Sequence, residues 1–288
     1  MSDKGNSIWK VAHGRELALG ATSRIMAVVN VTPDSFSDGG RFNSVDTAVR
    51  HGLDCVTEGA AILDIGGEST RPGGDPVSAA EEQDRILPVI ERLARETDAL
   101  LSVDTYRAET ARLAVKAGAH IVNDVFGAQK EPDIARVAAE TGAGLCLMHT
   151  GRDREKLADP VADQFHFLRR SLEIAEAAGV GRDAIVLDPG FGFAKDTDEN
   201  IELMARFEEL AALDFPLLVG TSRKRFVGAI TGREPVDRDA GTAATSVILR
   251  MAGAVIFRVH NVAFNRDVLA MTDAMLASRR RRETGPSR

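Results

Sequence analysis

Short apolar runs alternate with longer amphipathic stretches along most of the chain, beginning near Arg24. Each run ends in polar or glycine-rich residues, and a stretch with helical periodicity follows it. Continuous apolar strands that alternate with helices are typical of a parallel sheet covered on both faces. The expected strands are IMAVVNV, AILDIGG, LLSVDT, HIVNDV, GLCLMHT, AIVLDPG, FPLLVGTS and AVIFRVH. This repetition predicts an α/β fold, a (β/α)8 TIM barrel, in preference to a doubly wound open sheet.

The two ends of the chain are expected to lie outside the barrel. Residues 1–24 contain IWKVAHGRELALGATSR, in which apolar and polar residues alternate around an HGR turn. This pattern predicts an N-terminal β-hairpin extension that closes the bottom of the barrel. The barrel itself is expected to span residues 25–278. Residues 279–288 form a basic stretch, RRRRETGPSR, which we expect to be a disordered tail.

Composition and charge exclude several classes of protein. The chain has 288 residues, of which 44% are hydrophobic, and a formal net charge of −7. An acidic chain has no general attraction for nucleic acid, so we expect no nucleic-acid partner. No apolar stretch approaches the roughly 18 residues of a membrane span, and the N-terminus lacks a signal core, so we expect no membrane association. Cys55 and Cys146 lie far apart in apolar segments, and two buried reduced thiols are typical of a cytoplasmic protein.

A long polar loop follows the first expected strand directly. It reads NVTPDSFSDGG and runs from Asn30 to Gly40. A turn needs only a few such residues, and connections in compact domains are usually short. A loop of this length and polarity therefore predicts ligand binding rather than a simple connection.

Polar residues end nearly every expected strand. In a (β/α)8 barrel, the active site forms at the carboxyl ends of the strands and in the loops after them. A single Asp or Asn there usually caps a helix or makes a turn, but a whole rim of polar residues predicts a ligand site. The residues are Asn30, Asp64, Asp104, Asn123-Asp124, Met148-His149, Asp188-Pro189-Gly190, Gly220 to Arg225 and Arg258 to His260.

Two carboxylates and an amide, those of Asp104, Asp188 and Asn123, are expected to converge in the barrel mouth. They suit a neutral heterocycle with several N–H donors, because a carboxylate can accept two N–H bonds. Metal ligation is the competing use of this trio. It is less favoured, since no His among them completes a transition-metal set.

Cationic residues come from the last two strand ends, at Lys224, Arg258 and His260, and Arg71 in the second loop is a further candidate. Loops after the seventh and eighth strands commonly form the phosphate site of a barrel. These residues therefore predict a site for a polyanion such as pyrophosphate. No Ser-His-Asp spacing or activated Cys is evident, so covalent catalysis is unsupported.

Seven motifs, in order from about Ile25 to Val262, closely resemble the dihydropteroate synthase family of the folate pathway. They are NVTPDSFSDGG, LDIGGESTRPG, SVDT, VNDV, LDPGFGFAK, GTSRKRFVG and RVHNV. The resemblance implies a transferase that condenses 7,8-dihydropterin-6-ylmethyl pyrophosphate with p-aminobenzoate to 7,8-dihydropteroate and pyrophosphate. Pyrophosphate would leave first with the help of Mg²⁺, and the arylamine, neutral near pH 7, would attack without a strong base.

The resemblance also implies a role for individual residues. The pterin would be bound by Asp104, Asn123, Met148, Asp188 and Lys224. The pyrophosphate would be bound by Arg258 and His260, with Asn30 as the Mg²⁺ ligand and Asp38 organising this region. The p-aminobenzoate pocket would comprise Phe36, Thr70, Arg71, Pro72, Phe193 and Ser222, and Gly220 would also line the substrate site. Those expected to act in catalysis are Asp38, Asp104, Asp188, Lys224, Arg258 and His260.

Further expectations follow from the same resemblance. The loops Thr32–Gly40 and Glu68–Gly74 would fold over the site. The family is commonly dimeric, so a homodimer is expected. Sulfonamides, which mimic p-aminobenzoate, are expected ligands, and the sequence does not decide between a sulfonamide-sensitive and a sulfonamide-insensitive member. Asn261 stands where the family usually has Asp, and Arg225 where many members have Ser, without removing an expected contact.

Two alternatives use the same scaffold. A pterin-binding barrel that carries methyltetrahydrofolate for methyl transfer would keep the carboxylate–amide trio but would not need the SRK and RVH residues. A non-catalytic pterin-binding paralogue would usually have lost loop residues, and here they are present. The synthase is therefore the favoured hypothesis.

Overall fold

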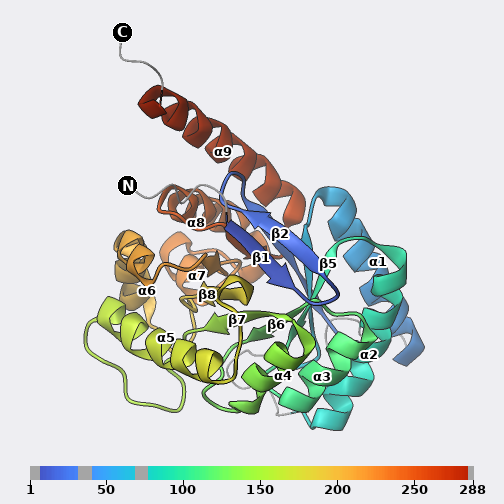
Figure 1. Ribbon diagram of the computed structural model, residues 1–288. Coiled ribbons are helices and arrows are strands. Elements are labelled where there is room, and N and C mark those ends of the chain that lie inside the picture. Colours follow the sequence, from blue (N-terminus) through green and yellow to red (C-terminus); the bar gives the residue numbers. More distant parts are fainter. Residues whose placement is uncertain (1–6, 32–40, 69–76, 285–288) are drawn as a thin grey trace.

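The computed structural model describes residues 7–31, 41–68 and 77–284, and its centre is an eight-stranded parallel sheet (Figure 1). The strands are β3 (Arg24–Asn30), β4 (Ile62–Gly66), β5 (Leu100–Asp104), β6 (Ile121–Asp124), β7 (Gly144–Met148), β8 (Ile185–Asp188), β9 (Leu218–Val219) and β10 (Ile256–Val259). Their order is β8-β7-β6-β5-β4-β3-β10-β9. A parallel bridge between Leu187 and Leu217 links the two outer strands, so the sheet closes almost completely into the predicted (β/α)8 barrel.

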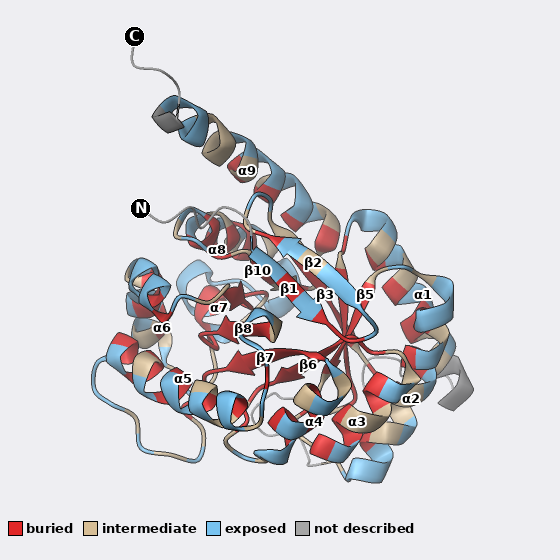
Figure 2. Cartoon of the chain, viewed as in Figure 1, coloured by how far each residue is buried: buried red, intermediate tan, exposed pale blue. Residues whose placement is uncertain are grey.

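Helices alternate with the strands and surround them (Figure 2). They are α1 (Arg41–Glu58), α2 (Ala79–Glu96), α3 (Ala108–Ala117), α4 (Asp133–Thr141), α5 (Pro160–Ala177), α6 (Thr197–Ala205), α7 (Arg225–Thr231), α8 (Asp239–Met251) and α9 (Val262–Thr284). Short 3-10 helices are η2 (Arg182–Ala184), η3 (Phe207–Leu213) and η4 (Pro235–Asp237). The helices have buried and exposed sides, as expected for an outer layer.

Local sequence explains where some of these helices begin and end. At α2, Glu81 N donates to Ser78 Oγ (3.2 Å) and Ser78 N donates to Glu81 Oε2 (3.0 Å), which forms a capping box. Asp159 caps α5 just before Pro160, a residue that suits the first helical position. Helix α4 ends at Thr141, and the next residue, Gly142, has a left-handed backbone conformation with a φ of 69°.

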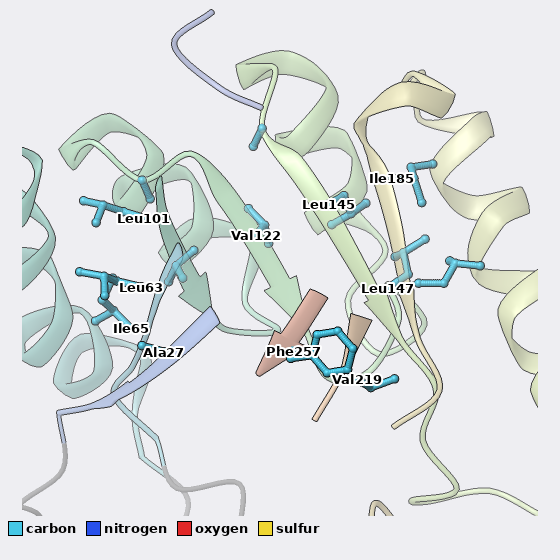
Figure 3. Close-up of a cluster of buried hydrophobic side chains, with 14 of the residues drawn as sticks. Ala27, Leu63, Ile65, Leu101, Val122, Leu145, Leu147, Ile185, Val219 and Phe257 are labelled. Carbon is cyan, nitrogen blue, oxygen red and sulfur yellow. The ribbon is translucent and has the colours of Figure 1, made fainter. Parts of the chain in front are cut away.

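The two faces of the barrel strands contribute to different apolar clusters, since side chains alternate along a strand. Outward-facing side chains pack under the helices, and Figure 3 shows Ala27, Leu63, Ile65, Leu101, Val122, Leu145, Leu147, Ile185, Val219 and Phe257 among them. Inward-facing side chains form a second cluster, here called the barrel floor. The residues that the barrel strands contribute to it are Met26, Ile62, Leu100, Ile121, Cys146, Val186, Leu218 and Ile256.

The N-terminal hairpin packs on the barrel floor, as predicted. Its strands, β1 (Ser7–Val11) and β2 (Arg15–Leu19), pair antiparallel, and Trp9, Val11 and Leu19 belong to the floor cluster. The indole of Trp9 donates to the Ala184 carbonyl oxygen at 2.8 Å. A Cβ atom at Gly144 would lie only 2.7 Å from Val11 Cγ1, so glycine is required for this close approach.

The C-terminal end differs from the prediction. The helix α9 continues to Thr284, so residues 279–284 are helical and not part of a disordered tail. Arg281 and Arg282 lie in its last turn, where cationic side chains interact favourably with the helix dipole. Among the described helices, none combines the length and apolar character needed to span a membrane.

Candidate active site

The candidate site forms one layer above the barrel floor. Side chains two positions apart in a strand point to the same face. Residues two positions after the floor residues therefore face the barrel interior, closer to the carboxyl ends of the strands. They include Asp64 after Ile62, Asn123 after Ile121, Asp188 after Val186, Gly220 after Leu218 and Arg258 after Ile256.

The guanidinium group of Arg258 contacts two carboxylates. Its Nε atom lies 2.6 Å from Asp64 Oδ2, and its Nη2 atom lies 2.9 Å from Asp104 Oδ2. The sequence predicted that the carboxylates bind a heterocycle in the barrel mouth and that the cations form a separate polyanion site. That separation is wrong for Arg258, because its long side chain reaches back across the barrel to the carboxylates.

The sequence placed Asp64 among the polar strand ends but gave it no role in binding or catalysis. Asp64 is fully buried and accepts a hydrogen bond from Asn123 Nδ2 at 3.1 Å as well as the bond from Arg258. Its other oxygen, Oδ1, has no hydrogen-bond partner among the described residues. The strand pattern already indicates that Asp64 faces the barrel interior, because it lies two positions after a floor residue, as Asn123 does.

The carboxylates and the lysine of the site have shifted pKa values. The pKa of Asp104 is raised to about 7, mainly by burial. The positive charge of Arg258 opposes this shift, and the negative charge of Asp64 adds to it. Burial raises the pKa of Asp188, against the effect of Lys224. Burial also lowers the pKa of Lys224 to about 7, although Asp188 opposes this shift. Such shifts cluster at functional sites, so the electrostatics support a ligand site here.

Arg258 keeps its charge in this setting. Burial lowers the pKa of its guanidinium, but the nearby Asp64 and Asp104 carboxylates raise it by more, and the net shift is upward. The guanidinium therefore remains a cation between two carboxyl groups at physiological pH.

Lys224 and Phe193, both predicted site residues, contact each other. The Lys224 ammonium donates to the Phe191 carbonyl oxygen and lies 4.1 Å from the centroid of the Phe193 ring. Arg152, which the sequence did not single out, lies with its guanidinium carbon 4.8 Å from the same centroid. A Cβ atom at Gly192, whose φ is +77°, would lie 2.7 Å from Lys224 Cδ, so this contact requires glycine.

Ser222 and His260 also meet, at the rim. Ser222 Oγ lies 2.9 Å from His260 Nδ1 and accepts a hydrogen bond from the His260 backbone N–H at 3.1 Å. Asn261 Nδ2 donates to Asp239 Oδ2 at 2.8 Å, so an Asp in its place would bring two carboxylates together. Arg225 is exposed at the start of α7.

The remaining predicted residues lie at the strand ends or outside the described residues. Asn30 ends β3 and is half-buried, and Met148 ends β7 and is buried. Five residues lie outside the described ranges: Phe36, Asp38, Thr70, Arg71 and Pro72.

Arg107 connects both chain segments that flank residues 69–76. Its Nη1 atom lies 2.7 Å from Glu68 Oε2, and its Nη2 atom donates to the Val77 carbonyl oxygen at 2.6 Å. The same Nη1 atom lies 2.8 Å from buried Glu82. The described ends of this connection are therefore tied to one side chain.

Known proteins resemble this chain over most of its length. A family model described as pterin binding enzyme matches residues 26–260. The dihydropteroate synthase of Bacillus subtilis (strain 168) is 45% identical over 269 residues, which make up 93% of this chain and 94% of the relative. The dihydropteroate synthase of Escherichia coli (strain K12) is 40% identical over 274 residues, or 93% of this chain and 96% of the relative.

Solved structures agree with these matches. A dihydropteroate synthase from Xanthomonas albilineans, determined with 4-aminobenzoic acid, is 43% identical with a TM-score of 0.89, covering 94% of this chain and 99% of that chain. One from Clostridium difficile, in the presence of pteroic acid, is 45% identical with a TM-score of 0.87, covering 89% and 98%. The chain therefore belongs to the dihydropteroate synthase family of pterin-binding enzymes.

Proposed function

We propose that the protein joins 7,8-dihydropterin-6-ylmethyl pyrophosphate to p-aminobenzoate, forming 7,8-dihydropteroate and pyrophosphate in folate biosynthesis. The observation that carries the proposal is the polar layer above the barrel floor, which holds Asn123 and Asp188. Arg258 of this layer contacts Asp104, and Lys224 interacts electrostatically with Asp188. Membership of the dihydropteroate synthase family supports the same reaction.

The acidic part of the layer suits the pterin ring. Asp188 Oδ1 accepts the Gly190 N–H at 2.7 Å, which orients the carboxylate and leaves Oδ2 for an N–H of the ring. The side chain of Asn123 donates from Nδ2 to Asp64. Its side-chain oxygen, Oδ1, is therefore the atom that would accept a hydrogen bond from a ligand. Met148, buried at the end of β7, would pack against the ring.

Arg258 and His260 would bind the leaving pyrophosphate. The contacts of Arg258 to Asp64 and Asp104 use Nε and one N–H of Nη2, and a guanidinium has five N–H donors. Donors therefore remain for phosphate oxygens while the two carboxylates are held. His260 is oriented by Ser222 at the same rim.

The reaction would proceed by ionisation first. Breaking the bond between the methylene carbon and the pyrophosphate oxygen leaves both electrons on oxygen and a positive charge on carbon, shared with the pterin ring. The buried carboxylates would stabilise that charge. The amine of p-aminobenzoate then forms the new C–N bond and releases one proton, and it needs no strong base because it is already neutral.

The residues present fit a magnesium ion on the pyrophosphate. Mg²⁺ usually keeps several waters and takes one or two protein oxygens together with substrate phosphates. Asn30, at the end of β3, would supply such an oxygen, and Asp38 would help to organise the region. Bound there, Mg²⁺ would neutralise charge on the leaving group. No cluster of three or more His, Cys, Asp or Glu residues suited to a metal is found in the described part of the chain.

The p-aminobenzoate pocket would lie beside Phe193 and Ser222, with Phe36, Thr70, Arg71 and Pro72 completing it. A Yersinia pestis dihydropteroate synthase that is 41% identical to this chain, with a TM-score of 0.85, was solved as a sulfonamide drug complex. We infer that sulfonamides compete with p-aminobenzoate here too.

A homodimer and a cytoplasmic location complete the proposal. Ile248 and Met251 of α8 and Met271 of α9 are exposed apolar residues, with Met271 74% exposed. A shallow pocket beside them is lined by Val247, Asp267, Val268, Met271 and Thr272. A second copy of the chain would cover this surface. Cys55 and Cys146 are both buried free thiols, which suits a reducing compartment.

The test is a two-substrate assay with purified protein and Mg²⁺. Pyrophosphate and dihydropteroate should appear only when the pterin pyrophosphate and p-aminobenzoate are both supplied, and a sulfonamide should compete with p-aminobenzoate. Absence of turnover with both substrates and Mg²⁺ would contradict the proposed reaction. Sulfonamide inhibition that p-aminobenzoate cannot reverse would contradict the shared pocket.

A further inference from the structure

Lys195, a half-buried lysine with no role in the proposed reaction, connects two neighbouring strand ends. Its Nζ atom donates to the Gly190 carbonyl oxygen at 2.9 Å and lies 2.8 Å from His149 Nδ1. His149 directly follows Met148 at the end of β7, and Gly190 lies in the turn that follows Asp188 at the end of β8. Lys195 therefore joins the segments that carry two of the proposed pterin-binding residues.

The turn after Asp188 is held by side chains along its length. Three successive carbonyl oxygens each accept a hydrogen bond from a different side chain. The pairs are Gln164 to Pro189 (3.2 Å), Lys195 to Gly190 and Lys224 to Phe191. In a planar peptide, fixing the carbonyl also fixes the following N–H. The Gly190 N–H, which lies in the peptide whose Pro189 carbonyl Gln164 holds, donates to Asp188 Oδ1 at 2.7 Å. Lys195 holds the other peptide of Gly190 through its carbonyl oxygen, so both sides of the residue that orients the Asp188 carboxylate are fixed.

The two strand ends also touch each other directly. The His149 backbone N–H donates to the Asp188 carbonyl oxygen at 2.8 Å. Gly190 has a φ of +64°, and a Cβ atom there would lie 1.9 Å from the His149 carbonyl oxygen. Because the two backbones are in van der Waals contact, a shift of one segment must displace the other.

The far side of His149 is held as well. His149 Nε2 lies 2.9 Å from Asp163 Oδ2, and Arg154 forms an ion pair with the same carboxylate at 2.5 Å. Burial, followed by the charge of Lys195, lowers the pKa of His149 to about 3, so the imidazole is neutral near pH 7. Asp163 Oδ2 and Arg154 Nη2 both lie 2.9 Å from His149 Nε2. The tautomer that donates from Nε2 to Asp163 accepts at Nδ1, which matches the Lys195 donor.

We propose that Lys195 is a positioning residue for the pterin pocket, because it holds the end of β7 against the turn that orients Asp188. The proposal rests on the proposed pterin-binding role of Asp188 and Met148. Lys195 acts through Gly190 and His149 and need not touch the ring. Losing its hydrogen bonds should weaken pterin binding selectively, since small displacements of binding groups have large effects on affinity and rate.

The test compares Lys195→Met with Lys156→Met. Lys156 contacts the residue before Lys195, since its Nζ atom donates to the Ala194 carbonyl oxygen at 2.8 Å, and it pairs with Glu199 at 2.5 Å. Lys195→Met should raise the Kd of 6-hydroxymethylpterin and the KM of the pterin pyrophosphate at least about tenfold, with the KM of p-aminobenzoate unchanged. Lys156→Met should leave all three values at the wild-type level.

Two results would overturn the proposal. One is an unchanged pterin affinity in Lys195→Met, and the other is an equal loss for both substrates that follows a loss of stability. Lys195→Gln keeps an N–H donor and should lose less pterin affinity than Lys195→Met. If Lys195→Met does not fold, the comparison of Lys195→Gln with wild type tests the proposal instead. An unchanged pterin affinity in Lys195→Gln would then contradict the positioning role of Lys195. Wild-type protein that binds pterin but forms no dihydropteroate would contradict the proposed function alone.

Discussion

Arg258 and Asp64 form an ion pair inside the barrel, with Arg258 Nε 2.6 Å from Asp64 Oδ2. Asp64 is fully buried, and Asp104 shares the same guanidinium at 2.9 Å. The cation that the sequence assigned to pyrophosphate therefore also holds two carboxylates of the interior layer. Binding of the ring and capture of the leaving group are expected to be energetically coupled through this one side chain.

Asp64→Asn tests the part played by the ion pair. A hydrogen bond to a charged group contributes about 1.5–3 kcal/mol, so kcat/KM for the pterin pyrophosphate should fall roughly tenfold or more. The Asp64 charge raises the pKa of Asp104, which is about 7, so the acid limb of the pH–kcat/KM profile should move to lower pH in the variant. Ser102→Ala is the control, because Ser102 is buried opposite Asp64 and its hydroxyl has no partner among the described residues. A profile that stays in place would argue against electrostatic coupling of these two carboxylates.

Asp188→Asn tests recognition of the ring. The amide oxygen can still accept the Gly190 N–H, but the other atom becomes a donor that meets the N–H groups of the pterin. We expect the Kd of 6-hydroxymethylpterin, measured by fluorescence titration, to rise roughly tenfold to a hundredfold. Asp183→Asn, at a half-exposed residue paired with Lys10, is the control. Unchanged affinity in Asp188→Asn would show that the ring binds elsewhere.

Lys224→Met tests the electrostatic cost of the buried cation. The pKa of Lys224 is about 7 in the folded protein against an ordinary value of 10.5. Between these values the unfolded chain binds more protons, so this group makes the folded state more stable as pH rises. The contribution is at most about 1.4 kcal/mol per pH unit. Urea unfolding between pH 7 and 9 should therefore give a smaller increase in stability for Lys224→Met than for wild type. The exposed Lys116→Met should keep the wild-type slope, and equal slopes for all three proteins would contradict the shifted pKa.

The fold was predictable because its signals are local. Apolar strands, amphipathic helices and glycine at helix ends each follow from a few consecutive residues, and the hairpin that closes the barrel floor was visible as an alternating pattern around HGR. The amphipathic stretch DENIELMARFEELAAL predicts a single helix, but it forms two, since α6 ends at Ala205 and η3 begins at Phe207. The helical pattern continues through this break, so periodicity alone could not locate it.

The site was predictable only as a set of strand ends. Position along a strand shows that Asp64, Asn123 and Asp188 face inward, but it does not show where a long side chain from another strand will go. Arg258 was therefore assigned to the polyanion site alone, although it contacts Asp64. The contacts of Lys195 and Arg107 depend on segments far away in the sequence, and no local pattern signals them.

Arg107→Met tests the tie between the two segments that flank residues 69–76. Glu82 is 1% exposed and pairs with Arg107, so removing the guanidinium leaves a buried charge without its ionic partner. Breaking such a pair costs about 3 kcal/mol, which urea unfolding should detect. The double variant Arg107→Met with Glu82→Gln should recover part of this loss, since no charge is left buried. Arg112→Met removes an exposed pair with Glu140 and should cost less than about 1 kcal/mol. Equal losses in the two single variants would mean that the Arg107 pair is no stronger than a surface contact.

Met271→Glu tests the proposed homodimer. Met271 of α9 is 74% exposed and lines the shallow apolar pocket next to α8. A carboxylate there would have to be desolvated in an interface between two copies, at a cost that weakens association. Size-exclusion chromatography with light scattering should show a dimer for wild type and a monomer for the variant at the same concentration. Val236→Glu introduces the same charge at an exposed apolar residue of η4, 71% exposed, and should remain dimeric. A Met271→Glu dimer as stable as the wild-type dimer would place the interface on another face of the molecule.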